Sequence, residues 1–221
     1  SGVPLMEVVS HPDMRTPEEA RSYLTKLHSI IQYLGVSTAN AQDGSFRCDA
    51  NISLRPVGQE EYGTKAEIKN MNSLRAVFMA LNHEQERQKK VLDSGERVIQ
   101  ETRGWSEERS ATYSQRNKEE AHDYRYFPEP DLPPLVIEDS WIEELRNNLP
   151  ELATDRLARF TEEYGLPEYD ARLLTNSKGM ADYYEQATSL HATAGDDGQK
   201  FAKNVSNWIL GDLSRLLNLE D

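Results

Sequence analysis

Cysteine, positive charge and long apolar runs are all scarce in this sequence of 221 residues. Cys48 is the only cysteine, which excludes a disulfide within the chain and fits a reducing compartment. The longest uninterrupted apolar run covers six residues, 76–81, whereas a transmembrane helix needs roughly 20. We therefore expect a soluble protein of the cytoplasm, or of an organelle matrix if the source is eukaryotic, with no membrane partner.

The balance of charge is strongly acidic. Against 25 Lys and Arg residues there are 38 Asp and Glu residues, which leaves a net charge of −13. This excludes a generally basic coat for nucleic acid, because phosphate binding needs clustered positive charge, although a local basic cleft stays open. The chain begins with Ser1 and shows neither an initiator methionine nor a leader, so we expect a fragment or a processed chain.

A proline cluster at residues 128, 130, 133 and 134 marks the expected domain junction. Residues 1–137 carry a net charge of −4 and residues 138–221 a net charge of −9, so the acid excess lies mainly in the second part. That part shows only helical periodicity, with helices expected to start near Ser140, Asp155, Pro167, Gly179 and Gly198. We predict an all-α domain over residues 138–221.

Residues 1–137 mix strand and helix signals. Thr16 and Pro17 combine a helix cap with proline at the first helical position, and Gly35 ends the helix that follows. Apolar and polar residues alternate over residues 46–55 and again over 65–69, which is typical of strands. The remaining segments are a second helix at 73–93 and short strands at 5–9, 98–102, 111–116 and 123–127. This order predicts an α+β fold: a largely antiparallel sheet with two flanking helices, followed by the helical domain.

The alternating strands gather charged side chains. The first lines up Arg47, Asp49, Asn51, Ser53 and Arg55, and the second lines up Lys65, Glu67 and Lys69. Carboxylates mixed with cations suit a magnesium–phosphate site, because Mg²⁺ takes one or two carboxylates while Arg and Lys neutralise a transferring phosphoryl group. The alternative is a solvated sheet face whose charges pair across strands. Cys48 alternates onto the apolar face, so we expect a buried core thiol.

Three further patterns bear on function. Residues 58–65 superficially resemble a Walker A loop, but the order is Gly-Thr-Lys and a strand follows, so we predict a turn. The five histidines show no ligand spacing with one another or with Cys48, which argues against a zinc site. Residues 124–131 alternate aromatic side chains and Arg125 with a proline-stiffened acidic turn. Such a segment can shape a pocket for a base or a metal-bound phosphate, or act as a clamp at the domain junction.

Several motifs, taken together and in order, resemble one protein family. They are SGVPLME at residues 1–7, GSFRCDAN at 44–51, KAEIKNMN at 65–72, QETR at 100–103, the segment 122–135 and SNWILG at 206–211. These stretches closely resemble the GatB family, one of the subunits of the aspartyl/glutamyl-tRNA amidotransferase, and the likeness covers essentially the whole chain. The resemblance implies an internal piece: the C-terminal portion of the cradle domain over residues 1–137, then the helical domain over 138–221.

By this resemblance the protein is a ligase subunit that works with a glutaminase subunit, and also with a small third subunit. ATP would phosphorylate the Glu carried on tRNA(Gln), or the Asp carried on tRNA(Asn), and ammonia from the glutaminase would then displace the phosphate. The family's acidic catalytic and metal positions match Glu7, Asp49 and Glu67, with Mg²⁺ and ATP as cofactors. The candidates for ATP binding are Arg47, Lys69 and Arg125. Because the resemblance implies further ligands before residue 1, we expect the isolated chain to be inactive.

Two other functions stay open on the sequence. The chain could be a non-catalytic scaffold or a tRNA-binding subunit, although an acidic chain without a basic helix argues against direct RNA binding. It could also belong to another ATP-dependent carboxylate–amine ligase, one that uses a free amino acid. A test for ATP-dependent amide formation on misacylated tRNA distinguishes the three.

Overall fold

The computed structural model describes residues 4–41, 43–117, 130–131, 133–190 and 196–220. The chain divides into two compact units, and the division does not follow chain order. The first unit comprises residues 1–26 and 40–128, and the second comprises residues 27–39 and 129–221. Helix α1 (Pro17–Leu34) therefore contributes its N-terminal part to one unit and its C-terminal part to the other. The expected domain boundary at residues 137 and 138 stays a prediction.

Both long helices begin where the sequence predicts. At the start of α1, Thr16 Oγ1 accepts a hydrogen bond from the backbone N–H of Glu19 at 3.1 Å. Gly35 ends this helix in the left-handed region, with a φ of 67°, which a residue without a Cβ adopts at no steric cost. Helix α2 (Leu74–Asp93) is capped in the same way by the Ser73 hydroxyl.

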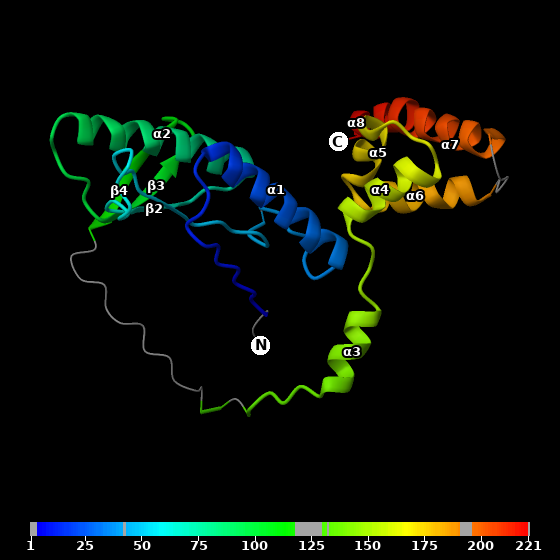
Figure 1. The fold of residues 1–221 in the computed structure, drawn as a ribbon, viewed down its shortest axis with the longest axis horizontal. Helices are drawn as coiled ribbons and strands as arrows, with labels where there is room; N and C mark the ends of the chain where they lie inside the picture. Colours follow the sequence, from blue (N-terminus) through cyan, green and yellow to red (C-terminus); the bar gives the residue numbers. More distant parts are fainter. Residues whose placement is uncertain (1–3, 42, 118–129, 132, 191–195, 221) are drawn as a thin grey trace. The chain divides into compact units, whose positions relative to one another are not determined.

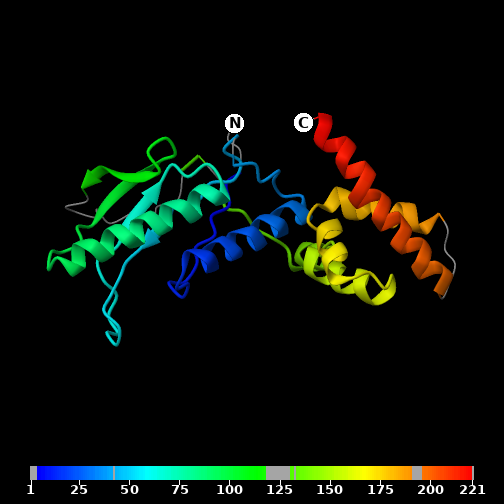
Figure 2. The same ribbon diagram turned by 90° about the horizontal axis from the view of Figure 1, so that it is seen from above.

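The first unit holds a four-stranded sheet in the order β1-β2-β3-β4. The strands are β1 (Ala50–Ile52), β2 (Ala66–Lys69), β3 (Glu101–Ser106) and β4 (Ala111–Asn117). The pairs β1–β2 and β3–β4 are antiparallel, whereas β2 and β3 run parallel. Helix α2 forms the crossover that a parallel pair requires, and it lies along the sheet (Figure 1 and Figure 2). The predicted α+β fold is confirmed, with one parallel pair in a sheet that is otherwise antiparallel.

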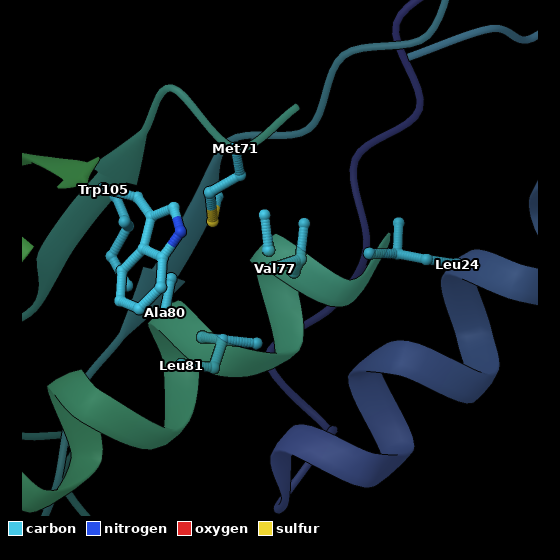
Figure 3. Packing of buried hydrophobic residues seen from close by; sticks show 8 residues of the cluster. Leu24, Met71, Val77, Ala80, Leu81 and Trp105 are labelled. Atoms are coloured by element: carbon cyan, nitrogen blue, oxygen red, sulfur yellow. The ribbon is translucent and has the colours of Figure 1, made fainter. Parts of the chain in front are cut away.

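The core of the first unit lies between α2 and one face of the sheet. Alternation along β2 turns Ala66 and Ile68 toward the helix, so both are fully buried. The buried members of this cluster are Leu24, Ile68, Met71, Ala76, Val77, Ala80, Leu81 and Trp105. Figure 3 shows Trp105 and Met71 on the apolar side of α2, with Leu24 reaching in from α1. The same alternation leaves Glu67 and Lys69 on the opposite face of the sheet.

Residues 139 onward form the predicted helices, each starting within two residues of the expected position. They are α3 (Asp139–Asn147), α4 (Ala153–Glu163), α5 (Glu168–Thr175), α6 (Lys178–Ser189) and α7 (Asp196–Trp208). The rings of Phe160 and Tyr184 are 5.0 Å apart in the core of this second unit. Tyr33 from α1 donates a hydrogen bond from its hydroxyl to the Thr175 carbonyl at 2.7 Å, which ties its part of α1 to the unit.

A π-helical turn interrupts the last long helix. After α7 the chain passes through η1 (Ile209–Leu213) into α8 (Ser214–Glu220). A wider turn rotates the residues that follow it relative to an α-helical stripe. Ile209 is buried, whereas Trp208 beside it is 67% exposed and Leu217 further along is also exposed. The predicted continuous apolar stripe from Phe201 to Leu217 is therefore wrong.

Other details of the predicted strands also differ from the structure. Residues 5–9 form no strand, and their apolar side chains are exposed. Strand β1 covers only three of the ten alternating residues, although partly buried and exposed residues alternate from 46 to 52. Residues 58–65 lie in the loop before β2, as predicted, and the expected strand at 123–127 lies outside the described residues. No helix in the described part of the chain is long and apolar enough to span a bilayer.

Candidate active site

The polar face of the sheet brings Lys69 between two of the carboxylates singled out by the sequence. Its Nζ lies 2.7 Å from Asp49 Oδ2 and 3.4 Å from Glu67 Oε1. The register explains this: Ala50 pairs with Ile68, so Asp49, one residue earlier, comes opposite Lys69. The hydrogen bond to Asp49 is the main reason that the pKa of Lys69 is raised, and the charge of Glu67 adds to it. The ammonium group therefore stays charged at neutral pH.

Glu67 is the better enclosed of the two carboxylates. Its side chain is 19% exposed, against 50% for Asp49. Asn51 pairs with it across β1 and β2, and Thr102 pairs with it across β2 and β3. The Thr102 hydroxyl donates a hydrogen bond to Glu67 Oε2 at 3.0 Å. Thr102 lies in the QETR motif, but no pattern in the sequence points to it, because only the parallel register places it beside Glu67.

The remaining predicted site residues are less closely placed. Arg47 is exposed and lies two residues before Asp49, on the same side of the alternating segment. Arg125 lies outside the described residues. Glu7 is exposed in the irregular stretch before α1, which no strand pairing holds against the sheet.

The expected convergence of three carboxylates is not found. In the ranges that the structure describes, no three side chains of His, Cys, Asp or Glu gather so that they could hold a metal ion. The structure instead joins Asp49 and Glu67 through Lys69 and leaves Glu7 out of the group. The physical reason is that Asp49 and Glu67 are fixed by strand register, whereas the predicted strand around Glu7 does not form.

Cys48 and Arg55 flank this face without belonging to it. The Cys48 thiol packs partly buried against the core cluster, and burial, with a smaller effect of Asp49, raises its pKa to about 11. It stays a neutral thiol, so the expected core role is confirmed. Arg55, predicted to line the polar face, instead stacks over the ring of Tyr62 in the following loop, with its guanidinium carbon 4.8 Å from the ring centre.

A buried ionic network lies on the other face of the sheet, under α2. Glu84 is fully buried; its carboxylate accepts hydrogen bonds from Arg87 at 2.6 Å and from the Thr112 hydroxyl at 3.0 Å. Arg103 of β3 places its Nε 3.2 Å from the same carboxylate and also pairs with Glu101. Burial alone would raise the pKa of Glu84, but these hydrogen bonds, above all from Arg87, outweigh it and lower the pKa. The network holds β3 against α2.

The pair of Asp49 and Glu67 fits the donor chemistry of a magnesium ion. Mg²⁺ takes one or two protein carboxylates and fills its other positions with phosphate oxygens and water. Lys69 and Arg47 add positive charge on the same face, as a polyphosphate ligand needs. The arrangement can therefore hold a nucleotide triphosphate with its metal.

A sheet domain with a carboxylate–lysine face, followed by a helical unit, is the class of protein that these observations define. The GatB/GatE catalytic domain family matches residues 1–143, most of the chain, and the match includes Asp49, Glu67, Lys69 and Thr102. The chain belongs to this family.

Curated GatB subunits of aspartyl/glutamyl-tRNA(Asn/Gln) amidotransferases are similar to the chain over almost all of its length. It is 58% identical to the protein of Dehalococcoides mccartyi (strain CBDB1) over 218 residues, 99% of this chain and 44% of the relative. It is 57% identical to the protein of Carboxydothermus hydrogenoformans over 218 residues, with the same coverage. For Thermodesulfovibrio yellowstonii the values are 52% over 220 residues, 100% of this chain and 45% of the relative. The chain thus spans less than half the length of these relatives, and the resemblance carried by its motifs is confirmed.

Proposed function

We propose that this chain is the part of the GatB subunit of a tRNA amidotransferase that activates the substrate carboxylate with ATP. The substrate is Glu carried on tRNA(Gln), Asp carried on tRNA(Asn), or both. A side-chain carboxylate oxygen attacks the γ-phosphorus of ATP, and ADP leaves. Ammonia then attacks the acyl carbon, phosphate leaves and a proton is lost. The names of the relatives support this reaction class.

The observation that carries the proposal is the group of Asp49, Lys69 and Glu67 on one sheet face, inside the family match. An anion that attacks a polyphosphate crowds negative charge, so the site has to supply positive charge. Lys69 and Arg47 do so from the described face, and Arg125 is proposed as a third cation. Asp49, Glu67 and Glu7 are the proposed ligands of Mg²⁺, which when bound would neutralise phosphate oxygens.

The proposed partners follow from the need for ammonia and for a charged tRNA. The relatives are named as one subunit of an amidotransferase, so they belong to a multi-subunit enzyme. We propose a glutaminase subunit that releases ammonia and a small third subunit, with the assembly in the cytoplasm or an organelle matrix. The net charge of −13 favours tRNA contact through local basic positions rather than through the surface as a whole.

The test is Glu67→Ala in the full-length protein, assembled with its glutaminase partner. Amidation of misacylated tRNA should fall by about 10³-fold or more, the order expected when a group that stabilises phosphoryl-transfer charge is removed. Glutamine hydrolysis should stay measurable, because the change removes no core packing. Glu86→Ala is the matched control, since Glu86 is exposed on α2 and should leave both rates unchanged.

The outcomes separate the competing functions. Near-normal amidation by the Glu67→Ala enzyme would contradict the assignment and favour a scaffolding role for this chain. Amide formation on free amino acid, without tRNA, would identify a different carboxylate–amine ligase. A selective loss of the ATP-dependent step supports the proposal.

A further inference from the structure

We propose that Thr102 is a positioning residue that fixes the orientation of the Glu67 carboxylate for binding of a divalent cation. The inference rests on the proposed function and adds a residue to that site. It concerns the strand that follows α2, in the QETR motif, and not the segments that carry the proposed metal ligands.

The two oxygens of Glu67 have different partners. Oε2 accepts the hydrogen bond from Thr102 Oγ1 at 3.0 Å, while Oε1 faces Lys69 Nζ at 3.4 Å. A carboxylate held at both oxygens has its plane fixed, so its remaining lone pairs point in a defined direction. Without the hydroxyl, only the lysine contact would orient the group, and that contact comes from a flexible side chain.

Thr102 itself is held rigidly. The side chains before and after it, Glu101 and Arg103, are both buried in the ionic network under α2. Arg103 Nε lies 3.2 Å from Glu84, and its Nη2 donates to the Thr112 carbonyl at 3.0 Å. Because neighbouring residues of a strand point to opposite faces, this anchoring places Thr102 on the Glu67 side. The Thr102 backbone cannot move without disturbing buried charges.

The environment of the hydroxyl also suits a positioning role. Thr102 is only 6% exposed, so little water competes for its hydrogen bond. Its β-branched side chain has a restricted χ1, which limits the positions that the hydroxyl can take. Residues that hydrogen-bond a metal ligand in this way typically change metal affinity 10- to 100-fold when they are removed.

The test compares Mn²⁺ binding, followed by electron paramagnetic resonance, in the full-length protein within its assembled complex. Thr102→Val keeps the shape and removes the hydroxyl, so Mn²⁺ should bind about 10- to 100-fold more weakly. Thr102→Ser keeps the hydroxyl and should stay within about threefold of the parent. Thr64→Val makes the same chemical change at an exposed position before β2 and should have no effect. In steady-state amidation, the Val change should raise the KM for Mg·ATP more than it lowers kcat.

The outcomes are distinguishable. Parent-like Mn²⁺ affinity in the Thr102→Val protein, or equal weakening by the Ser and Val changes, would overturn the positioning role. Glu67→Gln serves as the reference: if it too leaves Mn²⁺ binding unchanged, the proposed site itself fails. A lower melting temperature of the Val variant with normal Mn²⁺ affinity would show a structural role only. If the Val variant does not fold, Thr102→Ala removes the same hydroxyl with a smaller side chain and decides the matter.

Discussion

Gln88 and Glu84 are polar residues in positions where an apolar stripe would continue. Val77 and Leu81 of α2 are buried, as the helical spacing predicts, and Glu84 and Gln88 extend the same face. The Gln88 amide donates to the Ile52 carbonyl and accepts from the Leu54 N–H, both at 3.2 Å. It therefore serves the backbone where β1 has ended and no strand partner remains. The sequence pattern could not show this, because side-chain polarity alone places both residues on the surface.

Replacement of Gln88 by alanine should cost about 3 kcal/mol of unfolding free energy, because it leaves a cavity and two buried backbone groups without partners. Lys89→Ala, one residue along and exposed, should change stability by less than about 0.5 kcal/mol. Urea denaturation followed by Trp105 emission measures both, after the exposed Trp141 and Trp208 are replaced by phenylalanine. Equal stability of the two variants would show that the Gln88 hydrogen bonds do not support β1.

At the scale of elements, local signals were reliable and pairing was not. Caps and glycine stops identify α1 and α2 closely, because the interactions that make them lie within a few residues. The length of β1, the parallel pair and the missing strand at 5–9 depend on partners far along the chain. The π-helical turn at Ile209–Leu213 is a change of one residue in a helical period, which an apolar stripe does not reveal.

Glycine substitutions in two elements should have opposite effects. Gly211 lies in the π-helical turn with open space where an added methyl group would project, so Gly211→Ala should stabilise the second unit by about 0.5–1 kcal/mol. Gly63 lies before β2, where a Cβ would overlap the Leu54 carbonyl, so Gly63→Ala should destabilise the first unit by about 1–3 kcal/mol. Chemical denaturation of the two variants checks both signs. A stable Gly63→Ala protein would mean that the loop after β1 shifts without cost.

At the scale of the molecule, the periodic stripe of α1 looks like that of a single amphipathic helix. The structure assigns Leu24 to the core of the first unit and Tyr33 to that of the second. That division depends on which distant elements each turn meets, so periodicity alone cannot predict it. The site shows the same limit: spacing put Asp49, Glu67 and Lys69 on polar faces, but only the strand register joins them and adds Thr102.

Folding and nucleotide binding should therefore separate in a protein of these 221 residues. Both units have buried clusters of their own, so we expect a cooperative melting transition by circular dichroism. Two carboxylates joined by a lysine leave most of the magnesium shell to be supplied by other groups.

Mg·ATP should accordingly bind more weakly than about 1 mM, or −4 kcal/mol, in isothermal titration. The full-length protein, titrated in the same buffer, is the control and should bind more tightly, since the curated relatives are more than twice as long. Micromolar binding by the 221-residue protein would contradict this expectation. It would show that Asp49, Glu67 and Lys69, with the residues around them, already form a sufficient site.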